Sequence, residues 1–294
     1  MSHHDTASAD RRDTLMSGEP VPDARLTLPL EEPESGTIRV AFLIAPGAEL
    51  VDFAGPWGVF EYVLVGDGRR KPFELYTVAA GPEPVRVSGG MTIVPDYDLG
   101  TAPGPDIIVV PAMGLEDLAP EALDWLRAAH GQTAVTMSVC NGAFVLAQAG
   151  LLDGKSATAH HIGYGSFRAM FPEVNVLRGR RFVEDGRIAT AGGLTSGIDL
   201  ALRVVERYYG RDIAQQAATM LEYQGTGWMH PGSNSQFTER RTGTPERPVC
   251  PVCEMDVPKD TPQTRERDGI TWYFCGTWCS GQFDKAPELF AAAE

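Results

Sequence analysis

Hydrophobic positions follow two different periods along residues 37–225. Unbroken apolar runs at 38–44 and 106–111 are typical of strands buried on both faces of a sheet, whereas 120–130 has helical spacing. The pattern predicts strands at 38–44, 73–79, 91–94, 106–111, 134–139, 156–159, 180–183 and 188–191. It predicts helices at 51–65, 120–130, from 143 onward, 195–209 and 213–223. Because strands alternate with helices, the predicted fold class is α/β, a mostly parallel sheet with helices on both faces.

The pattern breaks down on both sides of this region. Residues 1–36 are rich in Pro, Asp, Glu and Ser, which predicts a disordered tail. Residues 226–248 lack periodicity and are rich in Gly, Ser, Thr, Pro and Arg, so they are predicted to form a linker. The segment 249–294 is rich in cysteine, unlike the rest of the chain, and this change in composition predicts a domain boundary near Glu246. A chain of 294 residues has room for one large and one small domain.

The chain carries a formal net charge of −14, which argues against binding to a phosphate backbone. The densest basic clusters, 69–71 and 178–181, are short and are interpreted as solvated loops. No stretch approaches the roughly 20 apolar residues that span a bilayer. We therefore expect no nucleic-acid partner and no membrane partner. Clustered cysteines are more often metal ligands than disulfides in the cytosol, so the expected location is cytoplasmic.

Cys140 has the strongest local indication of chemistry. An apolar, strand-like run ends at Cys140, and a helical pattern begins directly after Asn141 and Gly142. Such a helix directs its first amides and its positive dipole end at the sulfur, which favours the nucleophilic thiolate. Ligands of parallel sheets bind beyond the carboxyl ends of the strands, and segments 45–52 and 111–114 follow two other strands at the same rim. The alternative is a buried core cysteine.

Three motifs resemble the ThiJ/PfpI superfamily, in the branch that contains isonitrile hydratases and the sensor domains of AraC-type regulators. They are APGAELVDFAGPWGVFE (45–61), SVCNGAFVLAQAGLLDGKSATAHH (138–161) and TAGGLTSGIDLALRVVERYYG (190–210). The resemblance implies a flavodoxin-like sheet with Cys140 as the nucleophile on an elbow and Asp52 as the acid beside it. A carboxyl that contacts a thiolate must be protonated, because two bare anions repel. Glu49, in the same loop, is the less favoured acid, and helix capping is the alternative role of either residue.

The same resemblance implies further pocket residues. An oxyanion site would use the amide of Asn141 or Cys140 with an amide of the turn 111–114. The family usually has Gly-Gly where Ala112 and Met113 stand, and Gly114 follows them. The methionine side chain would narrow the pocket, which puts the substrate in doubt more than the chemistry.

Asn141 replaces a histidine that follows the nucleophile in many relatives, so a protease-like triad lacks its base. His160 matches a histidine found after the next strand and could assist, although a structural role or a dimer contact explains it equally well. His161 has no motif support. Thr195 and Ser196 lie near the pocket by analogy.

The remaining cysteines form two pairs that bracket a predicted hairpin: Cys250, Cys253, Cys275 and Cys279. Four thiolates suit tetrahedral zinc or another soft metal such as Cu(I), whereas unligated thiols in a small packed domain are the alternative. The segments PVCEMDV and WYFCGTWCSGQFDKAPELF resemble the YHS/TRASH family of metal-associated domains. Its core pattern of three cysteines matches Cys253, Cys275 and Cys279, which leaves Cys250 as a fourth ligand or a bystander. The resemblance implies metal sensing or delivery.

The expected function is a cysteine-dependent hydration, most simply of an isonitrile to an N-substituted formamide. The large domain needs no cofactor for this reaction, its partner is a small-molecule substrate, and the resemblance implies a homodimer. One alternative is a glyoxalase-like or deglycase-like activity. Another is a small-molecule, oxidant or metal sensor without turnover. A sensor that acts through DNA is disfavoured, because an AraC-type tail needs roughly 100 residues with two helix-turn-helix units.

Overall fold

Seven strands form the central sheet of the computed structural model, which describes residues 29–291. In spatial order they are β10 (Phe182–Asp185), β11 (Ile188–Ala191), β7 (Val135–Ser138), β6 (Ile107–Val110), β1 (Ile38–Leu43), β2 (Phe73–Ala79) and β5 (Tyr97–Asp98). Neighbours are parallel except for the antiparallel pair of β10 and β11. β6 and β7 are buried along their whole length, as expected of strands covered on both faces. The predicted mostly parallel sheet is confirmed.

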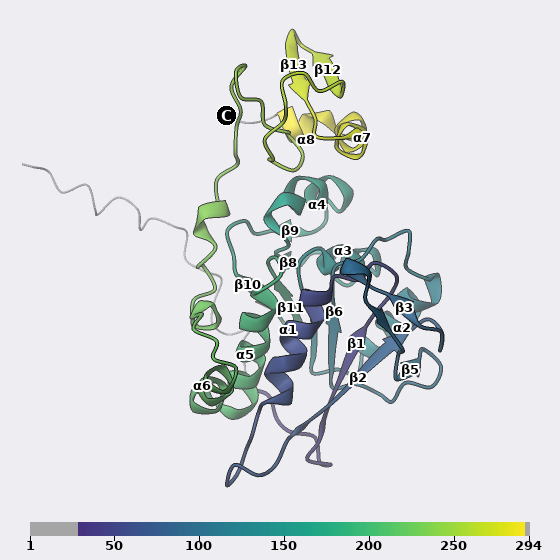
Figure 1. Cartoon of the computed structure of the whole chain (residues 1–294), viewed down its shortest axis with the longest axis vertical. Helices are drawn as coiled ribbons and strands as arrows, with labels where there is room; N and C mark the ends of the chain where they lie inside the picture. The colour runs from purple at the N-terminus through teal and green to yellow at the C-terminus, as the bar shows by residue number, and fades with distance from the viewer. Residues whose placement is uncertain (1–28, 292–294) are drawn as a thin grey trace, which may run out of the picture.

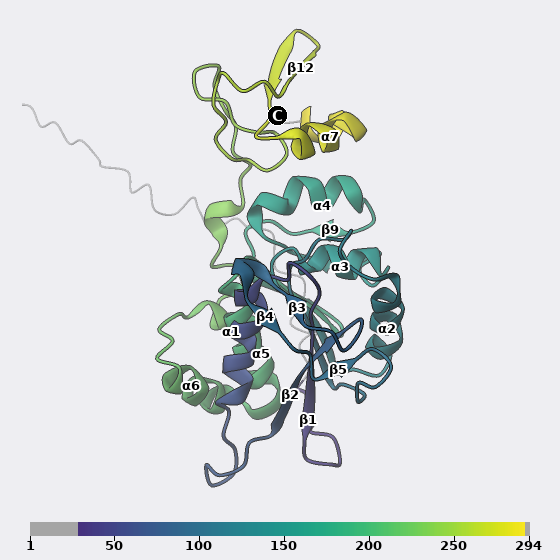
Figure 2. The same ribbon diagram turned by 45° about the vertical axis from the view of Figure 1, so that its right-hand side comes forward.

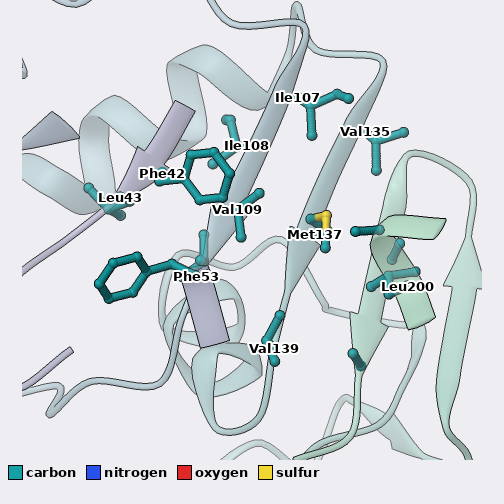
Figure 3. Close-up of a cluster of buried hydrophobic side chains, with 14 of the residues drawn as sticks. Phe42, Leu43, Phe53, Ile107, Ile108, Val109, Val135, Met137, Val139 and Leu200 are labelled. Carbon is teal, nitrogen blue, oxygen red and sulfur yellow. The ribbon is translucent and has the colours of Figure 1, made fainter. Parts of the chain in front are cut away.

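Helices cover both faces of this sheet (Figures 1 and 2). One layer contains α1 (Leu50–Glu61), α5 (Ser196–Tyr209) and α6 (Arg211–Met220), and the other contains α2 (Pro120–His130) and α3 (Gly142–Gln148). Figure 3 shows the core, in which Phe53 of α1 and Leu200 of α5 lie near side chains of β1, β6 and β7. Each such side chain contributes about 1.5–3 kcal/mol when it is fully buried. Across residues 29–291, no helix has the length and apolar character needed to cross a bilayer.

The shortest elements differ most from the predicted ones. The structure has two-residue strands β3 (Val85–Arg86), β4 (Thr92–Ile93), β8 (Ser156–Ala157) and β9 (Asn175–Val176), and a seven-residue helix α4 (Tyr164–Met170). The sequence predicts longer strands in place of β4 and β8 and misses β3, β5, β9 and α4. Elements of this length are too short to display a hydrophobic period. The bounds of β2 and α2, in contrast, agree with the prediction.

A small domain follows at the carboxyl end of the chain. It contains the antiparallel hairpin of β12 (Thr264–Arg267) and β13 (Ile270–Tyr273), then α7 (Thr277–Lys285) and α8 (Pro287–Ala291). Phe274, Phe283 and Phe290 form a separate hydrophobic cluster with three of the cysteines. Figure 1 shows α4 between the large domain and this small domain.

Two segments that the sequence assigns to a tail and a linker contact the large domain. Residues 1–28 of the predicted tail lie outside the described residues, but the Leu30 amide donates to the Arg207 carbonyl at 2.9 Å. In the predicted linker, Trp228 is 2% exposed and packs in the main core. The Pro231 carbonyl accepts from the Arg181 amide at 2.6 Å. Leu30 and Trp228 each pack against the main core, and the polar composition of the two segments does not predict these contacts.

Candidate active site and metal centre

Cys140 lies on a sharp turn between β7 and α3. Its φ of 59° is left-handed, a conformation that costs a residue with a Cβ about 1–2 kcal/mol. The turn is held by the Cys140 amide, which donates to the Gly192 carbonyl at 2.8 Å. Gly142 lies so close to the end of β6 that a Cβ there would be 2.1 Å from the Val110 carbonyl oxygen. This strained strand-to-helix turn is the geometry that the sequence predicts for a nucleophile elbow.

Asp52 lies beside this turn, on the first turn of α1, and is 0% exposed. One carboxyl oxygen, Oδ2, accepts from the Ala112 amide at 2.9 Å. The other, Oδ1, is buried and has no hydrogen-bond partner of standard geometry within 29–291. The Cys140 thiol and the Leu194 amide also interact with this carboxyl group. Burial raises the pKa of Asp52 from 3.8 to about 7, and the charge of Glu49 adds to this effect. Asp52 is therefore largely protonated below neutral pH.

Burial opposes ionisation of the Cys140 thiol. Burial and the neighbouring Asp52 raise the pKa of its thiol to about 12, although the amides of Asn141 and Leu194 act in the opposite direction. Desolvation thus acts against the thiolate that the start of α3 is expected to favour, and it outweighs the amides of Asn141 and Leu194. What the geometry provides instead is a buried pair, one thiol and one carboxyl.

The turn after β6 contributes differently from the prediction. The Ala112 amide donates to Asp52, so it fixes the acid and is not free as an oxyanion donor. The Met113 side chain is 9% exposed and packs in the main core. Gly114 lies against Asp117, because a Cβ added at Gly114 would be 2.5 Å from the Asp117 Oδ2 atom. The amide of Asn141 faces the Cys140 sulfur, and its expected role as an oxyanion donor stays a prediction.

His160 and Thr195 border this site without completing a triad. Burial lowers the pKa of His160 to about 4, so the ring is neutral at pH 7, and its Nδ1 accepts from the Ile162 amide at 3.3 Å. Thr195 is exposed, and its hydroxyl accepts from the Arg181 guanidinium at 3.1 Å. His160 therefore lines the site beside Gly193 and does not act as a base. Thr195 belongs to the turn before α5, which Arg181 supports.

Leu194 is the site residue that sequence reasoning misses. Its φ of 48° is left-handed, and this conformation points its amide at both Cys140 and Asp52. Its side chain is 40% exposed, which is high for a leucine in the large domain. A leucine has no sequence signature for left-handed backbone. The only usable signal is the Gly192-Gly193 pair before it, which indicates a tight turn.

The four cysteines of the small domain meet at one point. Their Sγ atoms all lie within 4.8 Å of one another, and the contacts of Cys253 with Cys275 and of Cys275 with Cys279 are 3.4 Å. A tetrahedral site with Zn–S bonds of about 2.3 Å needs sulfur separations of about 3.8 Å, so the cluster fits a single soft metal ion. Cys250 is one of the four, which supports its role as a fourth ligand. Cys275 alone is exposed.

The ligand loop around Cys250 and Cys253 is a tight turn. The Cys250 amide donates to the Met255 carbonyl and the Glu254 amide donates to the Cys250 carbonyl, both at 2.9 Å. Glu254 has a left-handed φ of 61°. Hydrogen bonds from the thiols of Cys253 and Cys279 lower the pKa of Cys250, so the cluster favours one anionic sulfur. A thiolate is the form of cysteine that binds a metal cation, so an anionic sulfur in the cluster favours cation binding.

Comparison with known proteins matches both halves of the chain. A model described as the DJ-1/PfpI family matches residues 38–207, and one described as the YHS domain matches residues 249–294. The chain is 32% identical over 190 residues to an isonitrile hydratase of Pseudomonas putida, covering 63% of this chain and 78% of that enzyme.

Regulators are also among the relatives. The chain is 29% identical over 180 residues to the HTH-type transcriptional regulator CdhR of Pseudomonas aeruginosa, covering 60% of this chain and 52% of the regulator. The chain thus spans about half the length of that protein. A solved ThiJ/PfpI family protein from Pseudomonas syringae superposes with a TM-score of 0.57 at 25% identity, covering 72% of this chain and 84% of that chain.

Proposed function

Because the chain belongs to the DJ-1/PfpI family and carries a YHS domain after it, we propose that it is a cysteine-dependent enzyme that adds water to a small isonitrile. The observation that carries the proposal is the buried pair of Cys140 and Asp52 at the left-handed elbow. The 32% identity to an isonitrile hydratase supports the choice of substrate class. The reaction yields an N-substituted formamide.

The pair supplies the two groups that this hydration needs. Once Asp52, the more acidic of the two, has lost its proton, its carboxylate accepts the Cys140 thiol proton as the sulfur attacks the terminal carbon of the isonitrile, and it then passes that proton to the same carbon. The product of this step is a thioimidate bound to Cys140. Asp52, now a carboxylate, activates a water that adds to the same carbon. One proton of this water passes through Asp52 to the nitrogen, the carbon–sulfur bond then breaks, and the remaining hydroxyl proton returns through Asp52 to Cys140 as the formamide leaves. Over the cycle one isonitrile and one water are consumed.

The neighbouring amides fit these roles. Amides of Asn141 and Leu194 face the sulfur and stabilise the charge that it carries as it leaves. The Ala112 amide holds one carboxyl oxygen, so the other is free to point at the reacting centre. Since His160 is neutral, the proton transfers depend on Asp52.

For the small domain we propose one zinc or other soft metal ion held by Cys250, Cys253, Cys275 and Cys279. The clustering of the four sulfurs, three on buried residues and one on the exposed Cys275, and the YHS match support this assignment. When bound, the ion crosslinks the ligand loop, the end of β13 and the start of α7, and so supplies folding free energy to a domain with few apolar residues. The hydration reaction does not use it.

A substrate screen tests the proposed reaction class. The full chain is incubated with an aliphatic isonitrile, methylglyoxal and a glutamine analogue, each in parallel with Cys140→Ala. We expect formamide from the isonitrile with the unchanged chain alone. Consumption of methylglyoxal that depends on Cys140, without formamide, would favour the glyoxalase-like alternative instead.

The second candidate is a sensor in which the Cys140 site binds a small molecule without turnover. The similarity to the transcriptional regulator favours it, and burial opposes ionisation of the Cys140 thiol. Calorimetric binding of an isonitrile with no product would support the sensor over the enzyme. The prediction of no nucleic-acid partner rests on the net charge of −14, and binding of random duplex DNA at low salt would contradict it. A homodimer and a cytoplasmic location remain predictions.

A further inference from the structure

The ligand loop of the small domain packs directly on the large domain. Gly165 of α4 lies so close to the loop that a Cβ there would be 2.4 Å from the Val252 carbonyl oxygen and 3.2 Å from the Phe290 ring. Val252 stands between Cys250 and Cys253, so the backbone of the metal loop itself touches α4. Figure 1 shows α4 in this intermediate position.

An ion pair holds the same contact. Glu254 Oε2 accepts from the Arg178 guanidinium at 2.8 Å, and the two side chains are only 10% and 19% exposed. Arg178 in turn lies over the Tyr164 ring, 4.8 Å from its centroid. The Glu254 carboxylate also accepts from the Arg241 amide at 3.2 Å. Because Glu254 directly follows Cys253 in left-handed conformation, its reach to Arg178 depends on the shape of the ligand loop.

The segment just before α4 forms a wall of the Cys140 site. The His160 ring lies against Gly193, where a Cβ would be 2.0 Å from its Cδ2. Gly193 precedes Leu194, whose amide faces Cys140 and Asp52. The stack continues outward, since the rings of His160 and His161 are 4.3 Å apart.

Two further contacts fix this wall. The His161 ring stacks on Phe237 at 4.0 Å with nearly parallel planes, so the segment 226–248 holds its outer side. On its inner side, Gly163 lies against the Asn141 side chain, where a Cβ would be 2.6 Å from Oδ1. One continuous segment, 160–170, thus contacts the metal loop at one end and the residues around Cys140 at the other.

We propose that the metal-bound ligand loop positions the segment 160–170, through Glu254 and Arg178, and thereby keeps the Cys140 site closed. Metal release loosens the turn that presents Glu254, the Arg178 pair opens, and the His160 wall moves away from the turn that contains Leu194. Cys140, which is 8% exposed in the closed arrangement, then becomes accessible. Glu254 and Arg178 are positioning residues in this account. The consequence for catalysis rests on the proposed function, but the coupling itself does not.

Peptide-resolved alkylation tests the coupling. The full chain, loaded with Zn²⁺ or treated with a chelator, receives a short pulse of iodoacetamide, and mass spectrometry measures the labelling of the Cys140 peptide alone. We expect chelation to accelerate labelling of Cys140 about fivefold or more, the lower end of common coupling factors. Equal rates in both states would overturn the proposal.

A matched pair of substitutions tests the link. Glu254→Gln removes the charge that Arg178 binds, whereas Asp256→Asn removes the exposed partner of Arg241 two residues later. With zinc content confirmed in each sample, Zn²⁺-loaded Glu254→Gln should label at Cys140 as fast as the chelated parent chain, and Asp256→Asn should behave as the loaded parent. Parent-like labelling of zinc-loaded Glu254→Gln would exclude this ion pair as the link.

Hydrogen exchange adds a measurement without substitutions. Amides in 160–170 should exchange faster in the chelated parent chain than in the Zn²⁺-loaded chain, and unchanged protection would contradict the proposal. Both readouts are independent of turnover. A chain with metal-dependent labelling but no formamide production would therefore reject the proposed function and leave the coupling standing.

Discussion

At the residue scale, the site depends on two protons and two strained residues. Cys140 and Leu194 are both left-handed, at φ of 59° and 48°, and the Leu194 amide interacts with both Cys140 and the buried carboxyl of Asp52. Such strain persists only where the surrounding structure holds it. Burial raises the pKa of both the thiol and the carboxyl, so the pair holds both of its protons at acidic pH.

Asp52→Asn is expected to change how stability depends on pH. The pKa of Asp52 is raised from 3.8 to about 7, so between these values the folded chain holds a proton that the unfolded chain has released. Its contribution to stability therefore falls as pH rises through this window, by about 4 kcal/mol in total at about 1.4 kcal/mol per pKa unit.

Urea denaturation at both ends of this pH window measures the effect. The free energy of unfolding of the parent chain, minus that of Asp52→Asn, should decrease from the acidic to the neutral end. Asp67→Asn, whose side chain is 72% exposed, is the control and should show no such trend. A difference that stays constant across the window would mean that Asp52 titrates normally.

At the scale of elements, close packing between strand ends decides the geometry of the elbow. The long buried strands and α2 follow from the hydrophobic pattern, and β2 matches its predicted bounds. The pattern also locates Cys140 and, through the resemblance, Asp52. It does not locate Leu194 or α4, because a left-handed leucine has no signature and seven residues cannot display a helical period. The hydrophobic pattern also does not predict the raised pKa of the Cys140 thiol, because desolvation depends on the residues that pack around the turn.

Gly142→Ala is expected to destabilise the large domain. The new methyl group would lie 2.1 Å from the Val110 carbonyl oxygen, so β6 and α3 must separate, at a cost of about 1–3 kcal/mol or more. Gly131→Ala is the control, because its right-handed backbone and a nearest contact of 3.5 Å accommodate a methyl group. Chemical denaturation compares the two. Equal midpoints would show that the elbow is not tightly packed against β6.

At the scale of the whole molecule, the two domains are joined by more than a linker. The segment 226–248 packs on the large domain through Trp228, and α4 lies against the metal loop. The small domain has its own hydrophobic cluster, but three of the four clustered cysteines are part of it. The stability of this domain should therefore depend on the metal.

Metal analysis of the purified chain tests that dependence. We expect about one equivalent of zinc or another soft metal per chain, and its removal should unfold the small domain, because binding free energy is folding free energy in such sites. Cys279→Ser should lose the metal, whereas Cys140→Ser, in the other domain, should retain it. Less than about a tenth of an equivalent after reconstitution would contradict a tetrathiolate site.

The central claim is that the Cys140 and Asp52 pair performs the chemistry, and kcat/KM for formamide production from an isonitrile tests it most directly. A positioned acid or base commonly contributes about 10²–10⁴-fold, so Asp52→Asn should lower kcat/KM by that factor. Cys140→Ala should reduce it to background, while both variants keep the unfolding transition of a folded chain. If both folded variants retain the kcat/KM of the parent chain, the pair is not the catalytic site.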